Sequence, residues 1–290
     1  MKHIPVLIEE VIEFLRPRSN ESFIDATVGQ GGHAKEILEH TLPGGKLLAF
    51  ERDSENLKTA KKNLSKYSNR ITFINDSFAH IKSHAYDNGF SKVNGILLDI
   101  GFSSYHVEDN GRGFSFMADG PLDMRYDTTQ GCTAAQIINT YSIDELTNIF
   151  QKFGEERQAT NIAQAISKAR KHKEIETTYE LVEVVESVKK RFGRIHPATQ
   201  VFQALRIETN DELGQLEQAL PDAIELLKPG GRIAIITFHS LEDRIVKRFF
   251  KKQDGQGFKI VNKHVIIPTK TEIKINPRSR SAKLRVLEKL

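Results

Sequence analysis

The sequence predicts an α/β protein whose doubly wound parallel sheet is interrupted by an all-helical insertion. In the first hundred residues, short apolar segments alternate with segments whose apolar residues recur at helical spacing, which is the order of βαβ units. Between about 133 and 212 only the helical spacing appears, and the alternation resumes afterwards. We therefore expect a discontinuous domain, residues 1–104 and 213–290, with a helical domain inserted at 105–212.

The expected strands are short, apolar and rich in branched or aromatic side chains, as strands buried on both faces are. In chain order they are "SFIDAT" (22–27), "KLLAFE" (46–51), "ITFIND" (71–76), "GILLDI" (95–100) and "RIAIITF" (232–238). Helices between them are predicted by apolar residues that share one face, such as Ala34, Ile37 and Leu38. Two late β-like runs, 258–267 and 282–290, are expected to close the sheet as an antiparallel pair.

One stretch around the start of the insertion has a different character. From 101 to 132 the chain is rich in Gly, Asp, Ser and Phe, and it is too long for an ordinary connection. We therefore expect this stretch to be functional. Beyond it, Ile162, Ile166 and Ala169 recur on one helical face, which supports the helical interpretation of the region.

Composition limits the class of protein. A chain of 290 residues fits one large domain with an insertion, and 39% hydrophobic with 28% charged residues is ordinary for a globular protein. The net charge is only +4, so a nucleic-acid surface would have to come from local basic clusters. The single cysteine, Cys132, excludes a disulfide within the chain and favours a cytosolic compartment. The N-terminal segment does not resemble a signal peptide, and no uncharged apolar run is long enough for a membrane span.

A glycine-rich turn follows the first expected strand, in "FIDATVGQGGHAKEIL" (23–38). Gly29, Gly31 and Ala34 match the G-x-G-x-x-A fingerprint of dinucleotide sites, and Glu51 lies 20 residues after Gly31. On spacing alone, the loop fits a nicotinamide dinucleotide. It is not a phosphate-binding Walker loop, because no Gly-Lys-Ser/Thr follows the glycines.

Asp25 distinguishes between the two cofactors that this loop could hold. A carboxylate just before the loop would repel a pyrophosphate, whereas it would attract the ammonium group of S-adenosylmethionine, which carries no phosphate. Glu51 is placed to bind a ribose, and Phe78 follows the third strand where an adenine would lie. Asp99 ends the fourth strand, at the edge where ligands of open sheets collect. These features favour S-adenosylmethionine.

Six motifs together resemble one family over almost the whole chain. They are "DATVGQGGH", "ILLDIGFSS", "GRGFSFMADGPLDMR", "HPATQVFQALRI", "FHSLEDRIVK" and "NPRSRSAKLR". The sequence is similar to the bacterial 16S ribosomal RNA cytosine-N4 methyltransferases, the MraW or RsmH family. The resemblance implies a class I S-adenosylmethionine-dependent methyltransferase fold with a helical insertion for substrate recognition. It also implies a cytidine in the decoding region of 16S RNA as the target, with the small ribosomal subunit as a partner.

The same resemblance implies a set of cofactor contacts. Carried over position by position, they fall on Gly31, Gly32, His33, Glu51, Phe78, Asp99 and His106. The family often has Asp where this chain has Glu51, and often Gln where it has His106. Glu51 keeps the carboxylate of the family pattern, whereas His106 changes the chemistry of its position.

Asp99 is the candidate catalytic residue. The lone pair of a cytosine N4 amine is delocalised into the ring, so the amine is a poor nucleophile. A carboxylate that accepts one N–H would localise this lone pair and take up developing positive charge. Many amino-methyltransferases have Asp/Asn-Pro-Pro-aromatic at this strand end, whereas this chain has "DIGF". Asp99 and Phe102 keep the register, but the prolines are missing.

The target base must leave its stack to reach a methyl donor. Phe102, Phe114 and Phe116 are candidate stacking partners, and each is equally compatible with a place in the core. Methylation at cytosine C5 usually needs a cysteine nucleophile, and Cys132 lies far from any expected strand end. The sequence therefore favours methylation of nitrogen or oxygen over methylation of C5.

The remaining motifs support structure more than chemistry. "FHSLEDR" lacks a nucleophile elbow, and we expect Ser240 to cap the following helix with Asp243 at its third position. His196 and Arg206 either contact RNA or tie the insertion to the rest of the chain. No group of His, Cys, Asp and Glu has metal-ligand spacing, so no metal is expected.

Two basic clusters are candidates for RNA contact. "NPRSRSAKLR" (276–285) and "KKRFGRIH" (189–196) each carry four cations, which suits phosphate contacts. Two other functions stay open from the residues alone. One is a nicotinamide-dependent oxidoreductase, which Asp25 argues against. The other is an RNA-binding ribosome assembly factor without catalytic activity, which Asp99 argues against.

Overall fold

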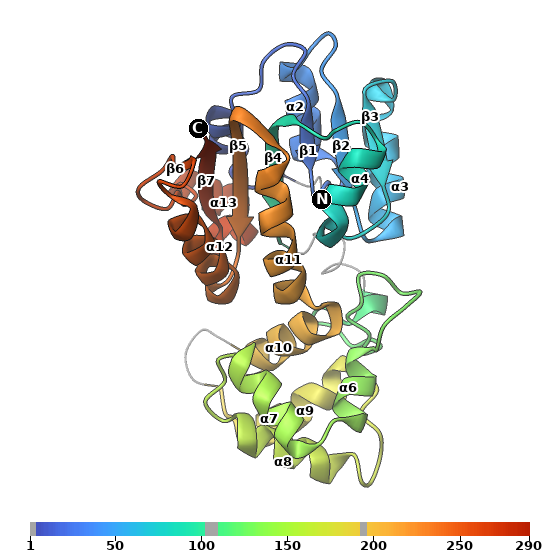
Figure 1. The fold of residues 1–290 in the computed structure, drawn as a ribbon. Helices are drawn as coiled ribbons and strands as arrows, with labels where there is room; N and C mark the ends of the chain where they lie inside the picture. The colour runs from blue at the N-terminus through green and yellow to red at the C-terminus, as the bar shows by residue number, and fades with distance from the viewer. Residues whose placement is uncertain (1–3, 102–109, 192–195) are drawn as a thin grey trace. The chain divides into compact units, whose positions relative to one another are not determined.

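The computed structural model describes residues 4–101, 110–191 and 196–290 (Figure 1). The chain divides into two compact units, one made of residues 1–101 and 213–290 and the other of residues 102–212. Each unit has a hydrophobic core of its own. In the described part of the chain, no helix combines the length and the apolar character that crossing a membrane requires.

The first unit carries all the named strands. They are β1 (Phe23–Asp25), β2 (Leu47–Phe50), β3 (Ile71–Ile74), β4 (Val93–Asp99), β5 (Leu227–Thr237), β6 (Phe258–Ile260) and β7 (Lys283–Lys289). Its helices are α1 (Ile8–Leu15), α2 (Gly32–His40), α3 (Ser54–Asn63), α4 (Ile81–Asp87), α11 (Glu212–Glu225), α12 (Ser240–Gln253) and α13 (Lys270–Ile275). Short 3₁₀ turns are η1 (Ser65–Tyr67), η2 (Phe78–His80) and η4 (Pro277–Ser281).

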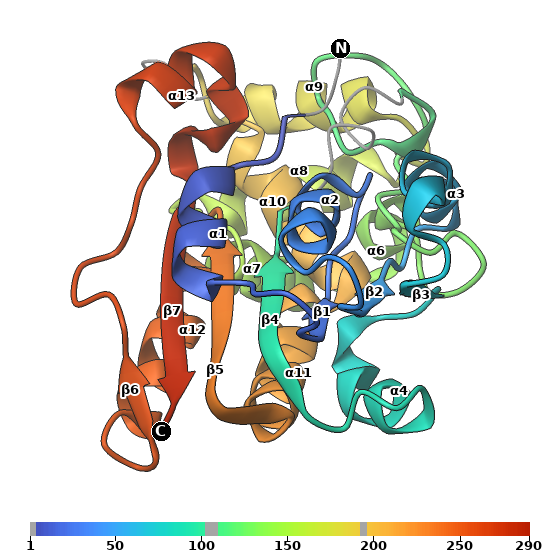
Figure 2. The same ribbon diagram turned by 90° about the horizontal axis from the view of Figure 1, so that it is seen from above.

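The described strands form one seven-stranded sheet in the order β3-β2-β1-β4-β5-β7-β6 (Figure 2). Strands β1 to β5 are parallel, whereas β7 is antiparallel to both β5 and β6. The doubly wound sheet and its antiparallel closing pair are therefore confirmed. Strand β6 is shorter than the predicted run 258–267, because Ile266 makes only an isolated bridge to Leu284.

Helices cover both faces of this sheet, which explains why its strands are apolar throughout. Helices α1, α2 and α3 contribute to one core, and α4, α11 and α12 contribute to the other. Successive strand residues point to opposite faces, so Phe23 lies in the first core and Ile24 in the second. Both side chains are fully buried.

The strand order reverses beside β1, which pairs with β2 on one side and with β4 on the other. Ligands of open α/β sheets bind at the carboxyl ends of the strands near such a reversal. Strand β1 ends at Asp25, and β4 ends at Asp99. The topology therefore brings these two acids to one edge of the sheet, as the sequence predicted for Asp99.

The second unit is helical. Its helices are α6 (Ala134–Thr140), α7 (Ile143–Lys152), α8 (Ala159–Ala169), α9 (Thr178–Val188) and α10 (Thr199–Asn210), with the 3₁₀ turn η3 (Asn110–Arg112) before them. Thr133, Ser142 and Thr177 each begin a helix with a capping box. Within its described residues this unit has no named strand, which confirms the all-helical insertion.

Candidate active site

The glycine turn before α2 has the backbone that its sequence predicts. Gly29 and Gly31 have φ angles of +52° and +92°, which L side chains rarely adopt. Space is limiting as well, since a Cβ on Gly31 would lie 2.8 Å from Leu64 Cδ1. A Cβ on Gly32 would lie 2.3 Å from Pro5 Cγ. Glycine is therefore needed at 31 and 32 to seat the loop against its neighbours.

Replacing Gly31 by Ala is expected to lower the free energy of unfolding by about 2–5 kcal/mol, the sum of a left-handed backbone cost and an overpacking cost. Gly89→Ala is the matched control, because Gly89 has a φ of +78° and a Cβ there would meet nothing within 4 Å. The control should lose only the backbone cost, about 1–2 kcal/mol. Urea unfolding measures both, and equal losses would contradict the packing argument.

Asp25 is a buried carboxyl group with only part of its hydrogen-bonding capacity used. Its side chain lies at the end of β1, and the residue is 1% exposed. The N–H of Thr27 donates to Oδ1 at 3.1 Å. Oδ2 has no hydrogen-bond partner among the described residues. Burial raises the pKa of Asp25 to about 7.

Asp99 ends the strand that pairs with the strand of Asp25, two residues beyond Leu97, which is the register partner of Asp25, and both acids contact Thr27. The backbone N–H of Asp99 donates to Thr27 Oγ1 at 2.6 Å. Its Oδ1 has no partner within the described ranges, and its side chain is 18% exposed. Burial raises the pKa of Asp99 to about 7, and the charges of Asp25 and Glu242 raise it further in the same direction. Two neighbouring carboxyl groups, each with an oxygen that accepts no described hydrogen bond, can bind a cation.

His33 approaches this pair from the first turn of α2. The residue is 6% exposed, and its Nε2 lies 2.9 Å from the carbonyl oxygen of Val6. Its Nδ1 lies 3.8 Å from Asp99 Oδ2, which is an ion-pair distance. Of the positions that the resemblance implies, His33 and Asp99 are thus neighbours.

Glu51 follows β2 and lies against the glycine turn. Its Oε1 accepts a hydrogen bond from the N–H of Asp53 at 2.9 Å. Burial raises the pKa of Glu51 to about 7, against the lowering effect of backbone N–H groups that include that of Gly29. Asp53 in turn caps α3 by accepting from the N–H groups of Glu55 and Asn56. This arrangement fixes the backbone around Glu51.

The other predicted contacts differ in how far the structure describes them. Phe78 begins η2 and packs, partly buried, against the core that contains α4 and α11. Ser77 beside it donates from Oγ to Gln215 Oε1 at 2.5 Å, which holds this turn against α11. His106 and Phe102 lie outside the described residues.

The sequence model of the MraW methylase family matches residues 1–290 of this chain. The chain belongs to the MraW methylase family. It is therefore a methyltransferase, and its α/β sheet with a helical insertion is the class I methyltransferase fold that the sequence predicted.

Similar proteins match this chain over nearly their whole length. The protein named Ribosomal RNA small subunit methyltransferase H from Finegoldia magna is 45% identical, and the match covers 100% of this chain and 99% of its own. The protein of that name from Elusimicrobium minutum is 48% identical over 99% of this chain and 98% of its own. The one from Clostridioides difficile is 42% identical over 99% of each.

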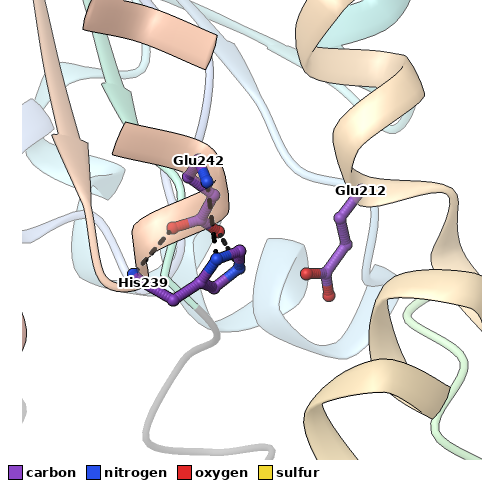
Figure 3. A group of neighbouring side chains, drawn as sticks. All are labelled: Glu212, His239 and Glu242. Atoms are coloured by element: carbon purple, nitrogen blue, oxygen red, sulfur yellow. Dashed lines mark hydrogen bonds and ion pairs between the residues drawn. The ribbon is translucent and has the colours of Figure 1, made fainter. Parts of the chain in front are cut away.

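Sequence reasoning misplaced one cap in this MraW-family chain. The residue that caps α12 is His239, not Ser240, because Nδ1 of His239 accepts from the N–H of Glu242 at 3.4 Å (Figure 3). Glu242 Oε2 in return accepts from the N–H of His239 at 3.3 Å, which completes a capping box. The sequence contained a sign of this cap, because Glu242 follows His239 by three residues. That is the spacing of a capping box in which His takes the place of Ser or Thr.

Glu242 is a site residue whose place near Asp99 the sequence did not predict. It is 1% exposed, and its charge raises the pKa of Asp99, so it faces the same cluster of acids. Asp243, which was expected to complete a capping box with Ser240, instead binds Arg285 Nε at 2.7 Å and Lys283 Nζ at 3.4 Å. Two cations of the predicted cluster at 276–285 are therefore held by an acid from α12.

Contacts within the helical unit show structural roles for three residues that the sequence left open between RNA binding and structure. Arg206 binds Glu212 at 2.8 Å, so it ties α10 to the start of α11; Figure 3 also draws Glu212. Phe114 is 9% exposed and stacks on Tyr126, so it belongs to the core. Phe116 stacks on the ring of His196 with centroids 4.6 Å apart.

The raised pKa values imply a stability that falls as pH rises. Asp25, Glu51 and Asp99 each have a pKa raised to about 7 in the fold, so the folded chain binds their protons more tightly than the unfolded chain. Their stabilising contribution is complete below about pH 4 and is lost as pH rises through about 7. Urea unfolding of the cofactor-free protein should show this fall, and Asp25→Asn should reduce it. A slope unchanged by Asp25→Asn would contradict the assignment.

Proposed function

We propose that this chain methylates the exocyclic N4 of a cytidine in the decoding region of 16S ribosomal RNA, with S-adenosylmethionine as donor. The observation that carries the proposal is the pair of acids at the strand reversal, the buried Asp25 and the partly buried Asp99, each with a carboxylate oxygen that lacks a described partner. Membership of the MraW methylase family supports methyl transfer. Relatives named Ribosomal RNA small subunit methyltransferase H support the RNA class.

The residues present fit the donor. The ammonium group of S-adenosylmethionine would satisfy the unpartnered carboxylate oxygens of Asp25 and Asp99. Glu51, beside the glycine turn, would accept hydrogen bonds from the ribose hydroxyls. Gly31, Gly32 and Phe78 would border the donor, and S-adenosylmethionine supplies an electrophilic methyl group on its sulfonium.

Asp99 is the proposed acceptor of the N4 proton. A carboxylate within reach of the reacting amine can accept its proton and release it afterwards, and Asp99 ends β4 at the edge of the sheet where the donor is expected. A carboxylate that accepts one N–H of the amine also aims the nitrogen lone pair away from itself, toward the donor methyl. Methylation of nitrogen then requires no cysteine nucleophile, which agrees with the exposed position of Cys132.

The helical insertion, residues 105–212, is the proposed RNA-recognition domain, and residues 1–104 with 213–290 are the proposed catalytic domain. A base in the decoding region is presented by folded RNA, so shape contributes to recognition. The assembled small subunit in the cytoplasm is the expected partner. Arg280 is exposed in the basic cluster at 276–285 and is a candidate phosphate contact.

Binding of the two candidate cofactors tests the donor assignment. Calorimetry should detect S-adenosylmethionine binding and no binding of a nicotinamide dinucleotide, because the pyrophosphate would meet the carboxylate of Asp25. Tighter binding of the dinucleotide would favour the oxidoreductase alternative and contradict the proposal.

A further inference from the structure

The tautomer of His33 follows from one contact. Nε2 of His33 lies 2.9 Å from the carbonyl oxygen of Val6, and a carbonyl only accepts. Nε2 therefore carries a hydrogen, and the neutral ring has its lone pair at Nδ1. That nitrogen is the one that lies 3.8 Å from Asp99 Oδ2.

A lone pair and a carboxylate that face each other repel, so this contact is favourable only when a proton resides on one of the two groups. The titratable groups that face Asp99 among the described residues are His33 from α2, Asp25 from β1 and Glu242 from α12. Both acids oppose negative charge on Asp99, and a cationic His33 would favour it.

We propose that His33 is a positioning residue that takes over the proton which Asp99 removes from the target amine. This inference rests on the proposed function. As the bond between N4 and the methyl carbon forms, the bond between that carbon and the sulfonium breaks, and the sulfur keeps its electrons. The N4–H proton passes to Asp99 while its bonding electrons stay on N4. The proton then moves from Asp99 to Nδ1 of His33, which leaves an imidazolium beside a carboxylate until solvent takes the proton.

The geometry gives this transfer a direction. Because the Val6 carbonyl fixes Nε2 as a donor, Nδ1 is the basic atom of the ring, and it points to Asp99. His33 is 6% exposed, so the ring is held in place by its surroundings. Protonating the ring also returns Asp99 to its ionised state, which the next cycle requires.

The substitution His33→Gln separates this role from a merely structural one. A glutamine side-chain N–H would still donate to the Val6 carbonyl, so the contact between α2 and residue 6 is kept, but no titrating nitrogen faces Asp99. We expect the single-turnover methyl-transfer rate at saturating donor to fall about 10–100-fold and its pH profile to shift. His40→Gln is the matched control, because His40 is an exposed residue of the same helix whose Nδ1 lies 2.8 Å from the Glu36 carbonyl oxygen. Wild-type rate and pH profile in His33→Gln would overturn the proposal.

A readout without substrate tests the pair directly. NMR titration of the protein with ¹⁵N-labelled histidine should show the neutral Nε2–H tautomer of His33, and Asp99→Asn should lower the pKa of this ring by at least about one unit. The Nδ1–H tautomer, or a pKa that Asp99→Asn leaves unchanged, would overturn the proposal. If wild-type protein failed to methylate small subunits, the proposed function would fail, whereas the NMR result would still decide whether His33 and Asp99 share a proton.

Discussion

Asp99→Asn is expected to reduce methyl transfer by about 10²–10⁴-fold, the usual contribution of a positioned proton acceptor. The amide has nearly the shape of the carboxyl group, and the N–H of Asp99 would still donate to Thr27 Oγ1. The asparagine amide does not bind a proton near neutral pH, so the N4 proton would have no acceptor at this position. Single-turnover transfer of a labelled methyl group measures the effect, with Asp87→Asn, an exposed carboxylate at the end of α4, as control.

The same substitution is expected to stabilise the donor-free protein. The pKa of Asp99 is raised to about 7, so above about pH 8 the folded chain carries a poorly solvated negative charge near Asp25 and Glu242. Asparagine removes that charge, and the midpoint of thermal unfolding should rise at about pH 8 and change little at about pH 5, where Asp99 is protonated.

Full activity in this variant would contradict the catalytic role. Retained RNA binding without methylation would exclude a non-enzymatic assembly factor.

Asp25→Asn is expected to weaken the binding of S-adenosylmethionine by about 10–100-fold. The donor's ammonium group would lose a charge-assisted hydrogen bond, which contributes about 1.5–3 kcal/mol, and each 1.4 kcal/mol corresponds to about tenfold in affinity. Isothermal titration calorimetry at about pH 8 measures the loss, since Asp25 is then ionised in the wild type. Asp87→Asn serves as the control again, because it removes an acid outside the site.

Proton release adds an independent check on Asp25. Its pKa is raised to about 7 by burial, and a bound cation would lower it, so donor binding near neutral pH should release protons from the wild type. Titrations in buffers of different ionisation enthalpy count these protons, and the variant should release fewer. Equal affinity and equal proton release in both proteins would remove Asp25 from the donor site.

The parts of the site that lie at strand ends could be predicted from the sequence. Asp25 and Asp99 each follow an apolar run that could only be a buried strand, and parallel strands bring their carboxyl ends to one edge. Gly31 was predictable for a similar reason, since a glycine between strand and helix marks a tight turn. Local pattern and topology agree at all three positions.

Other parts depend on contacts between residues that are distant along the chain. The basic run at 276–285 looked free of acids, yet Asp243 holds Arg285 across 42 positions of sequence. Glu242 reaches the acids of β1 and β4 because β5 pairs with β4, which no local spacing reveals. The interaction of His33 with the Val6 carbonyl likewise joins positions 27 apart. Such pairings require the fold before they can be seen.

Transfer of a labelled methyl group from S-adenosylmethionine tests the central claim most directly. Unmodified small ribosomal subunits and deproteinised 16S RNA would be offered as acceptors, and the labelled nucleoside would be identified after digestion. We predict N4-methylcytidine, with more label on the assembled subunit than on free RNA. Label on cytosine C5 or on another base, or no label on either acceptor while the donor still binds, would contradict the account.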